Sequence, residues 1–198
     1  AYAEGEVELA HEFRYRDPIL TPRTLVVAIS QSGETMDTLM AVRHAREQGS
    51  YVLAIVNTHG STIPREADAV LYTHAGPEVA VASTKAFLAQ ITACYLVGLY
   101  LAQLRGTKFP DELREILTEL QAIPDKIQAV LDSEESVREV ARAMKDTESV
   151  LFLGRHVGYP VALEGALKLK ELAYIHAEGF AAGELKHGPI ALIEEGQP

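Results

Sequence analysis

The chain has 198 residues, of which 47% are hydrophobic and 23% are charged. This composition excludes an intrinsically disordered chain, which combines low hydrophobicity with high net charge. The net charge of −10 argues against a nucleic-acid partner, because binding to a phosphate backbone needs a basic surface. The single cysteine and the absence of a signal-peptide pattern in residues 1–10 predict a cytoplasmic protein.

The first half of the chain predicts a parallel sheet. After a short strand-like segment at Val7–Phe13, the β-branched run Leu25–Ile29 is typical of a strand buried on both faces. Met36–Glu47 has helical spacing of its apolar residues, and Tyr51–Val56 and Ala69–Tyr72 predict two further strands. Strand, helix and strand in this order indicate a βαβ unit with right-handed crossovers.

Helices are expected in the middle of the chain. The apolar stretch Ser83–Arg105 contains polar residues, so it predicts a buried helix that ends at Gly106 rather than a membrane span. Cys94, in its centre, is expected in the core. A charged, helix-rich stretch then runs over residues 110–145, with a break at Pro124.

A second strand, polar loop and helix follow in the last third of the chain. Val150–Leu153 predicts a strand, Gly154–Tyr159 a loop and Val161–Tyr174 a helix, whereas the Gly- and Ala-rich Ala177–Pro189 predicts irregular structure. The fold class is therefore α/β, with two related halves and a helical connector. The expected division is 1–106 for the first half, 107–146 for the connector and 147–198 for the second half.

The segment Ser30–Thr35 is a candidate phosphate-binding loop. It lies between a predicted buried strand and a helix start, where α/β sheets bind ligands and where helix N–H groups favour anions. Ser30, Ser32 and Thr35 offer hydroxyl donors, and Gly33 permits a close backbone approach. The chain has no GxxxxGK[ST] pattern, which favours a phosphomonoester over a nucleoside triphosphate. A simple helix cap with solvent-exposed serines is the alternative.

Charged side chains gather on the predicted helix Val161–Tyr174. Glu164, Lys168 and Glu171 have the spacing of one helix face, and a carboxylate beside an ammonium can move protons. An exposed stripe of ion pairs is the alternative. His187, in the turn after Gly183, is a candidate acid–base group or a plain surface histidine. The histidines and the cysteine lack metal-ligand spacing, so a metal site is not expected.

Six segments in chain order carry a family resemblance: Glu12–Arg16, Ser30–Thr35, Ala75–Glu78, Val81–Lys85, Leu163–Glu171 and Gly183–Pro189. Together they resemble the isomerase part of the glucosamine-6-phosphate synthase family. That part is a sugar isomerase (SIS) module, in which the SQSGET-type loop is general and the LEGALKLKE and ELKHGP segments are more specific. The resemblance implies a three-layer SIS-type sandwich, with a parallel sheet between helices and a truncated second half.

The resemblance implies a reaction and a set of ligand contacts. Fructose 6-phosphate and glutamine-derived ammonia would give glucosamine 6-phosphate, a precursor of UDP-N-acetylglucosamine, through an imine and a ketose–aldose isomerisation. The residues implied to bind the phosphate are Ser30, Gln31, Ser32 and Thr35, and those implied to contact the sugar are Val81 and Ser83.

The resemblance also assigns catalytic roles. Glu171 would carry a proton between C1 and C2, with Lys168 and Glu164 supporting it. His187 would assist ring opening in the site of a neighbouring subunit, which implies a homodimer. The other implied partner is a glutaminase domain on the same full-length chain, and the resemblance implies neither a metal nor an organic cofactor.

Three family features are missing from this stretch: a hydroxyl-bearing loop before the first strand, a C-terminal tail with a lysine, and the glutaminase domain. Ala80 also stands where the family pattern has glycine. We therefore expect no turnover from this stretch alone. Two other functions stay open, a non-catalytic SIS sugar-phosphate sensor and a fructosamine-phosphate deglycase.

Overall fold

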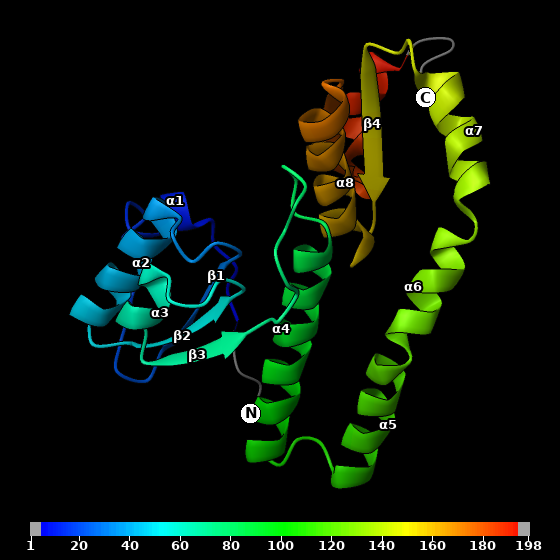
Figure 1. Cartoon of the computed structure of the whole chain (residues 1–198). Coiled ribbons are helices and arrows are strands. Elements are labelled where there is room, and N and C mark those ends of the chain that lie inside the picture. The colour runs from blue at the N-terminus through cyan, green and yellow to red at the C-terminus, as the bar shows by residue number, and fades with distance from the viewer. Residues whose placement is uncertain (1–4, 194–198) are drawn as a thin grey trace. The chain divides into compact units, whose positions relative to one another are not determined.

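The computed structural model describes residues 5–193, which fall into two compact units that divide between Ile116 and Leu117 (Figure 1). The first unit contains α1 (Ala10–Phe13), β1 (Leu25–Ser30), α2 (Met36–Glu47), β2 (Tyr51–Val56), α3 (Thr62–Glu66), β3 (Ala69–Tyr72), α4 (Lys85–Leu104) and most of α5 (Pro110–Gln121). The second contains α6 (Ile123–Leu131), α7 (Glu134–Met144), β4 (Ser149–Gly154), α8 (Gly158–Ala173), β5 (His176–Ala181) and the 3₁₀ helices η1 (Ala182–His187) and η2 (Pro189–Leu192). The three-part division expected from the sequence stays a prediction.

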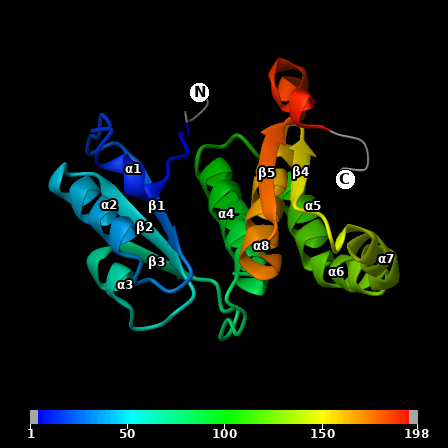
Figure 2. The same ribbon diagram turned by 90° about the horizontal axis from the view of Figure 1, so that it is seen from above.

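The sheet of the first unit has the order β1-β2-β3, and all three strands are parallel. Ala54 of the central strand β2 pairs with Ala28 of β1 and with Val70 of β3. Helix α2 packs on β1 and β2, and α1 and α3 pack on α2 (Figure 2). Because all three strands run the same way, their carboxyl ends share one edge of the sheet, and the loops that matter below leave from that edge.

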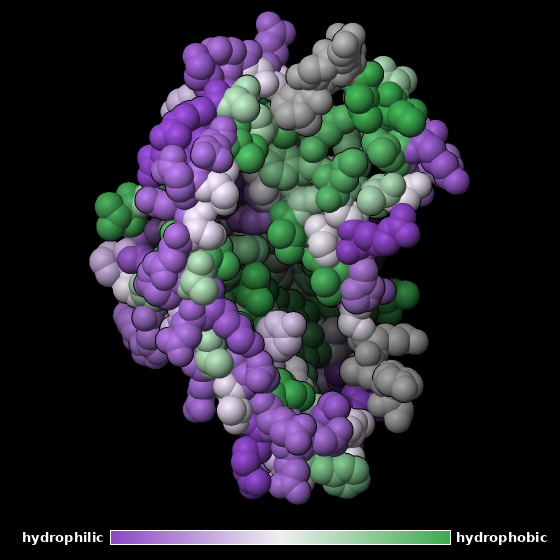
Figure 3. Space-filling view, turned by 90° about the vertical axis from the view of Figure 1, so that its right-hand side faces the viewer, coloured by the Kyte–Doolittle hydropathy of each residue, from purple (hydrophilic) through white to green (hydrophobic). Residues whose placement is uncertain are grey.

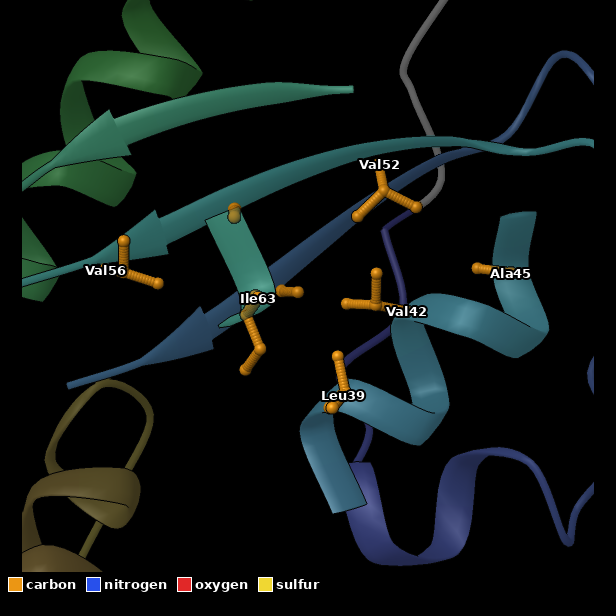
Figure 4. Close-up of a cluster of buried hydrophobic side chains, with 8 residues drawn as sticks. Leu39, Val42, Ala45, Val52, Val56 and Ile63 are labelled. Atoms are coloured by element: carbon orange, nitrogen blue, oxygen red, sulfur yellow. The ribbon is translucent and has the colours of Figure 1, made fainter. Parts of the chain in front are cut away.

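The core of the first unit lies between α2, α3 and the sheet. Apolar residues recur every third position along α2 and point at β2 and α3 (Figure 4). The side chains that form this contact are Leu39, Val42, Ala45, Val52, Val56 and Ile63, all with an exposed fraction of 4% or less. Burying a Val, Leu or Ile side chain contributes about 1.5–3 kcal/mol each, so this cluster holds the strand ends in place.

Glycines end two of the helices by the same device. At the end of α2, Gly49 has φ +81°, its N–H donates to the Arg46 carbonyl at 2.9 Å, and the Ser50 N–H donates to the Ala45 carbonyl at 3.0 Å. This is a Schellman motif, which needs a left-handed residue that glycine supplies without strain. Gly106, with φ +64°, ends α4 in the same way, as the sequence predicts.

Near the N-terminus the expected strand at Val7–Phe13 is wrong. The Leu9 carbonyl accepts hydrogen bonds from the Glu12 and Phe13 N–H groups at 2.9 and 3.0 Å, so the segment closes into the one-turn helix α1. The short helix α3 was not predicted, whereas the strands β1, β2 and β3 and helix α2 are confirmed. Short elements are set by local hydrogen bonds that periodicity does not reveal.

Burial of β1 on both faces is also wrong for the described residues. Leu25, Val27 and Ile29 alternate along one face of β1 and are 40%, 38% and 43% exposed. Figure 3 shows further apolar residues at the surface, next to hydrophilic ones. An apolar pattern predicts that a face is covered, but it does not say which segment covers it.

Helix α4 departs from its prediction in the same sense. Ala86 and Ala93 are its buried residues, and Cys94, expected in the core, is exposed. Within residues 5–193 this is the one helix with the length and apolar composition of a membrane span, and 6% of that apolar window is buried. A core helix of a water-soluble protein satisfies the same two criteria.

In the second unit, β4 and β5 form a parallel pair that α8 covers (Figure 2). The expectation of irregular structure over Ala177–Pro189 is therefore wrong for β5. Gly179 makes this packing possible, since a Cβ there would lie 2.9 Å from the Leu163 Cα in α8. The small residues that lower strand propensity are here the ones that let helix and strand approach.

The connector is helical as predicted, with α5, α6 and α7 in sequence. Pro124 occupies the first turn of α6, where its missing N–H costs no hydrogen bond.

Candidate functional site

The loop Ser30–Thr35 is closed by its own hydroxyls. The Ser30 Oγ accepts the Gly33 N–H at 3.1 Å and lies 3.1 Å from the Thr35 Oγ1. The Ser32 Oγ accepts the Glu34 N–H at 3.2 Å. Thr35 precedes α2, yet its side chain makes no capping hydrogen bond, which disfavours the simple helix-cap interpretation. The hydroxyls therefore define a compact turn at the N-terminus of a three-turn helix, an arrangement suited to an anion.

The loop between β2 and α3, which contains Ser61, packs against this turn. Gly33 has φ +67°, and a Cβ at this position would lie 2.1 Å from the Ser61 Oγ. The Gly33 carbonyl accepts the Ile63 N–H at 2.9 Å. Glycine is required here both for its backbone conformation and for the close approach of Ser61.

Glu34, the carboxylate of the loop, is hydrogen-bonded to the start of α3. The Glu34 Oε1 accepts the Thr62 N–H at 2.7 Å, and hydrogen bonds from Thr62 lower the pKa of Glu34 below its usual value. Glu34 therefore stays charged but is tied to the start of α3. The hydroxyls and amides of the loop are left as its anion-binding groups.

The segment between β3 and α4 is organised by Glu78. Its carboxylate accepts the Thr84 N–H at 3.1 Å, the Thr84 hydroxyl at 3.0 Å and the Ala86 N–H at 3.2 Å. The hydrogen bonds from the Thr84 and Ala86 amides lower the pKa of Glu78. This carboxylate caps α4 from a distance of six residues and folds the intervening segment into a loop.

The two sugar-contact candidates lie in that loop. Val81 is 94% exposed, and the Ser83 Oγ is buried without a hydrogen-bond partner among the described residues. A buried hydroxyl without a partner is uncommon in a folded protein, and its bonding capacity is available to a ligand.

The second unit carries the charged candidates on α8. The Lys168 Nζ lies 2.8 Å from the Glu171 Oε2 and 3.2 Å from the Glu164 Oε1, and the three side chains are 22–35% exposed. Partial burial opposes the charge on Lys168, but the hydrogen bonds that Lys168 donates to Glu171 and Glu164 outweigh it and raise the Lys168 pKa. The stripe is thus a half-buried three-centre cluster rather than a freely solvated face.

His187 ends the 3₁₀ helix η1. Its Nδ1 lies 2.9 Å from the Glu184 Oε2, which leaves Nε2 as the ring nitrogen for another partner. Gly188, with φ +142°, follows it and turns the chain into η2. A carboxylate on one imidazole nitrogen fixes the tautomer and orientation of the ring, as in many acid–base sites.

The structure thus gathers the predicted residues into two sets. One set lies in the first unit and contains Ser30, Gln31, Ser32, Thr35, Val81 and Ser83; the other lies in the second unit and contains Glu164, Lys168, Glu171 and His187. Within residues 5–193 no three His, Cys, Asp or Glu residues come together as a metal site.

Sequence reasoning missed Ser61, Glu184 and Asn57, whose main-chain N–H donates to the Gln31 carbonyl at 3.1 Å, and it did not single out Glu78. Asn57 directly follows a predicted buried strand, a position that points to the ligand edge of the sheet and could have revealed it. Glu184 precedes His187 by one helical turn, which is a usable spacing signal. Glu78 lies in one of the segments that carry the family resemblance, but no sequence signal indicated its role. Ser61 had no comparable signal, because its contacts depend on the loop conformation.

The fold and the loop at the end of β1 define the class of protein, and comparison with known proteins defines the family. Parallel strands flanked by helices, with a hydroxyl-rich loop at a strand's carboxyl end, define an α/β ligand-binding domain. The SIS domain family matches residues 4–100 and 143–198. The chain belongs to this family.

Within the family, the chain is highly similar to proteins that carry one name. The chain is 78% identical over 193 residues to glutamine–fructose-6-phosphate aminotransferase (isomerizing) of Corynebacterium efficiens, and 71% identical to the protein of that name in Mycobacterium tuberculosis. Each match covers 98% of this chain and 31% of the relative. The C-terminal domain of glucosamine-fructose-6-phosphate aminotransferase from Francisella tularensis matches with a TM-score of 0.94 and 41% identity, over 98% of this chain and 55% of that one.

Proposed function

We propose that this chain is part of the isomerase module of a glutamine–fructose-6-phosphate aminotransferase, which makes glucosamine 6-phosphate. The observation that carries the proposal is 78% identity over 98% of the chain to a relative of that name. The closed hydroxyl loop at the end of β1 supports it independently, since it suits a phosphomonoester. The chain spans about a third of the length of the relative, so activity belongs to the longer protein.

The phosphate of fructose 6-phosphate would bind at the start of α2. Gln31, Ser32 and Thr35 donate to its oxygens, while Ser30, which is 6% exposed, contributes mainly by fixing the turn. The sugar hydroxyls reach the Ser83 Oγ and the backbone at Val81.

Glu171 would perform the proton transfer. Ammonia adds to the C2 carbonyl of the open-chain sugar, and loss of water gives an imine. The Glu171 carboxylate removes a proton from C1 while the imine nitrogen takes one up from solvent, which gives an enolamine. Glu171 then returns its proton to C2 while the O1 hydroxyl loses its proton to solvent, so that C1 becomes the aldehyde. The Lys168 Nζ, 2.8 Å from the Glu171 Oε2, positions this carboxylate, and Glu164 holds Lys168 from its other side at 3.2 Å.

His187 would open the sugar ring. Glu184 at its Nδ1 directs Nε2 toward the ring oxygen or the anomeric hydroxyl, where it exchanges a proton. We further propose that the protein is a cytoplasmic homodimer in which His187 serves the neighbouring subunit. Ammonia would come from a glutaminase domain of the same full-length chain, and the product would supply UDP-N-acetylglucosamine synthesis.

The test uses the full-length parent protein with fructose 6-phosphate and glutamine. Formation of glucosamine 6-phosphate and glutamate in equal amounts is expected. Unphosphorylated fructose is the matched control, and it should react much more slowly because it cannot use the Ser30–Thr35 loop.

Two other outcomes would overturn the proposal. Saturable binding of fructose 6-phosphate without product would indicate a sugar-phosphate sensor. Release of a free amine from a fructosamine phosphate, with no synthesis of glucosamine 6-phosphate, would indicate a deglycase.

A further inference from the structure

Asn57 is a buried polar residue directly after β2, and it has no place in the function derived so far. It is 8% exposed, and its side chain makes three hydrogen bonds to the segment after β3. The Oδ1 accepts the Thr73 hydroxyl and the Ala75 N–H, each at 2.9 Å, and the Nδ2 donates to the Gly76 carbonyl at 2.7 Å. The Ala75 N–H can only donate, so the orientation of the amide is fixed.

The backbone of the same residue is tied to the phosphate loop. The Asn57 N–H donates to the Gln31 carbonyl at 3.1 Å, and the Thr58 hydroxyl reaches the same carbonyl at 3.4 Å. Asn57 thus bonds through its main chain to the Ser30–Thr35 loop and through its side chain to residues 73–76. The latter lead directly into the loop that holds Val81 and Ser83.

This connection does not simply continue the sheet. The register of β2 with β1 ends at Val56 opposite Ser30, and the pairing of β2 with β3 ends at Val56 opposite Tyr72. Past these pairs the three chain segments lead to different loops. The main-chain N–H of Asn57 makes the next bond on the β1 side, to the Gln31 carbonyl, and its side-chain amide supplies the bonds on the β3 side.

We infer that Asn57 is a positioning residue that sets the phosphate loop and the sugar-contact loop in register for one bipartite ligand, a sugar phosphate. The inference rests on the proposed function. It predicts that loss of the Asn57 side-chain amide lowers the affinity for ligands that contact both loops. The affinity for ligands that contact the Ser30–Thr35 loop alone should not change. Small misplacements of groups that bind one ligand together are costly, whereas each loop by itself keeps its donors.

The experiment compares two probes on the full-length parent protein, fructose 6-phosphate and inorganic phosphate. For Asn57→Ala we expect the Kd for fructose 6-phosphate to rise by about 10-fold or more, and that for inorganic phosphate by less than about 2-fold. Ser50→Ala is the matched control, because Ser50 lies at the opposite end of β2, is 4% exposed and donates from Oγ to the Thr21 carbonyl at 3.0 Å. It should leave both constants unchanged.

A milder variant covers the case in which Asn57→Ala does not fold. Thr73→Val removes one donor to the Asn57 Oδ1 while keeping the side-chain shape, and it should weaken fructose 6-phosphate by about 2–5-fold with no change for inorganic phosphate. Equal weakening of both probes, or of neither, would overturn the inference. A wild-type protein that binds inorganic phosphate but not fructose 6-phosphate would instead overturn the proposed function and the inference with it.

Discussion

The two units use one local topology, strand, loop and helix, in opposite ways. In the first unit, β1 and α2 are joined by a loop rich in hydroxyls, and the apolar face of α2 packs into the core (Figure 4). In the second, the backbone after β4 is packed so tightly that a Cβ on Gly154 would lie 2.0 Å from the Gly158 carbonyl oxygen, and the charged groups lie on α8 instead.

The loop in the first unit and the helix face in the second suit different chemical tasks. A loop at a helix N-terminus offers fixed N–H and O–H donors, which suit binding of an anion. A helix face offers side chains at defined spacing, which suits a carboxylate that transfers protons and an ammonium that pairs with it. The proposed ligand binding in the first unit and the proposed proton transfer in the second should therefore be separable by mutation.

The largest expected effect is on turnover, from Glu171→Gln. The amide cannot accept the C1 proton, so kcat should fall by about 10²–10⁴-fold while the Kd for fructose 6-phosphate stays within about 3-fold of wild type. Glu164→Gln is the matched control, since it contacts the same ammonium at 3.2 Å but is not the proposed base. Wild-type turnover in Glu171→Gln would refute the division of labour.

A second large effect is expected from Gly33→Ala. Gly33 and Gly60 both have positive φ, +67° and +73°, but only at Gly33 does an added Cβ meet another atom, the Ser61 Oγ at 2.1 Å. Gly60→Ala should cost about 1 kcal/mol and Gly33→Ala about 2–4 kcal/mol in the free energy of unfolding. Urea unfolding of both variants measures the difference, and equal costs would mean that the close approach of Ser61 is unimportant.

Ser32→Ala should act on affinity alone. The variant removes a hydroxyl donor to a charged phosphate, so the Kd for fructose 6-phosphate should rise by about 10-fold with kcat nearly unchanged. Ser136→Ala, which removes an exposed hydroxyl on α7 that donates to the Ser133 carbonyl at 2.9 Å, controls for loss of a surface serine. Titration calorimetry checks both variants, and an unchanged affinity in Ser32→Ala would contradict the phosphate-loop assignment.

The smallest expected effect is on acid stability, from Glu78→Gln. Amide donors lower the Glu78 pKa in the folded protein, so on acidification the unfolded chain takes up this proton first. The stabilisation is present above the unfolded pKa of about 4.3 and is lost as the pH falls through the lower folded value. Thermal unfolding between about pH 5 and pH 3 should show a shallower loss of stability in Glu78→Gln than in wild type. Lys168 differs in sign: its raised pKa gives a contribution that is lost at alkaline pH.

Much of the fold was accessible from the sequence. The strands β1 to β4 and the helices α2, α4 and α8 carry long periodic patterns, and Gly106 ends α4 where expected. Strand β5 was missed because Gly179 and its small neighbours serve the approach of α8, a tertiary reason that opposes local propensity. The exposed faces of β1 and α4 were missed because apolarity predicts cover without naming its source.

The candidate site was accessible only in part. Hydroxyls after a strand and charges along a helix face are local signals, and they indicated Ser32 and Glu171. Lys168 contacts Glu171 from one helical turn away, but the contacts around the Ser30–Thr35 loop are not local: Ser61 lies 28 positions from Gly33 in the sequence, and Asn57 reaches Gly76. Only the parallel sheet brings such segments together, so the supporting residues emerged from the structure.

The phosphate loop has a consequence for the kinetics of binding. Residues 30–35 include no lysine or arginine, and the chain carries a net charge of −10. The proposed ligand, a dianionic sugar phosphate, would therefore be repelled by this chain at long range and attracted only within contact distance of neutral donors. At physiological ionic strength the screening length is about 8 Å, which removes most of the repulsion and leaves the short hydrogen bonds intact. Added salt should thus speed association while barely changing dissociation, the reverse of the behaviour of a site built on arginine or lysine.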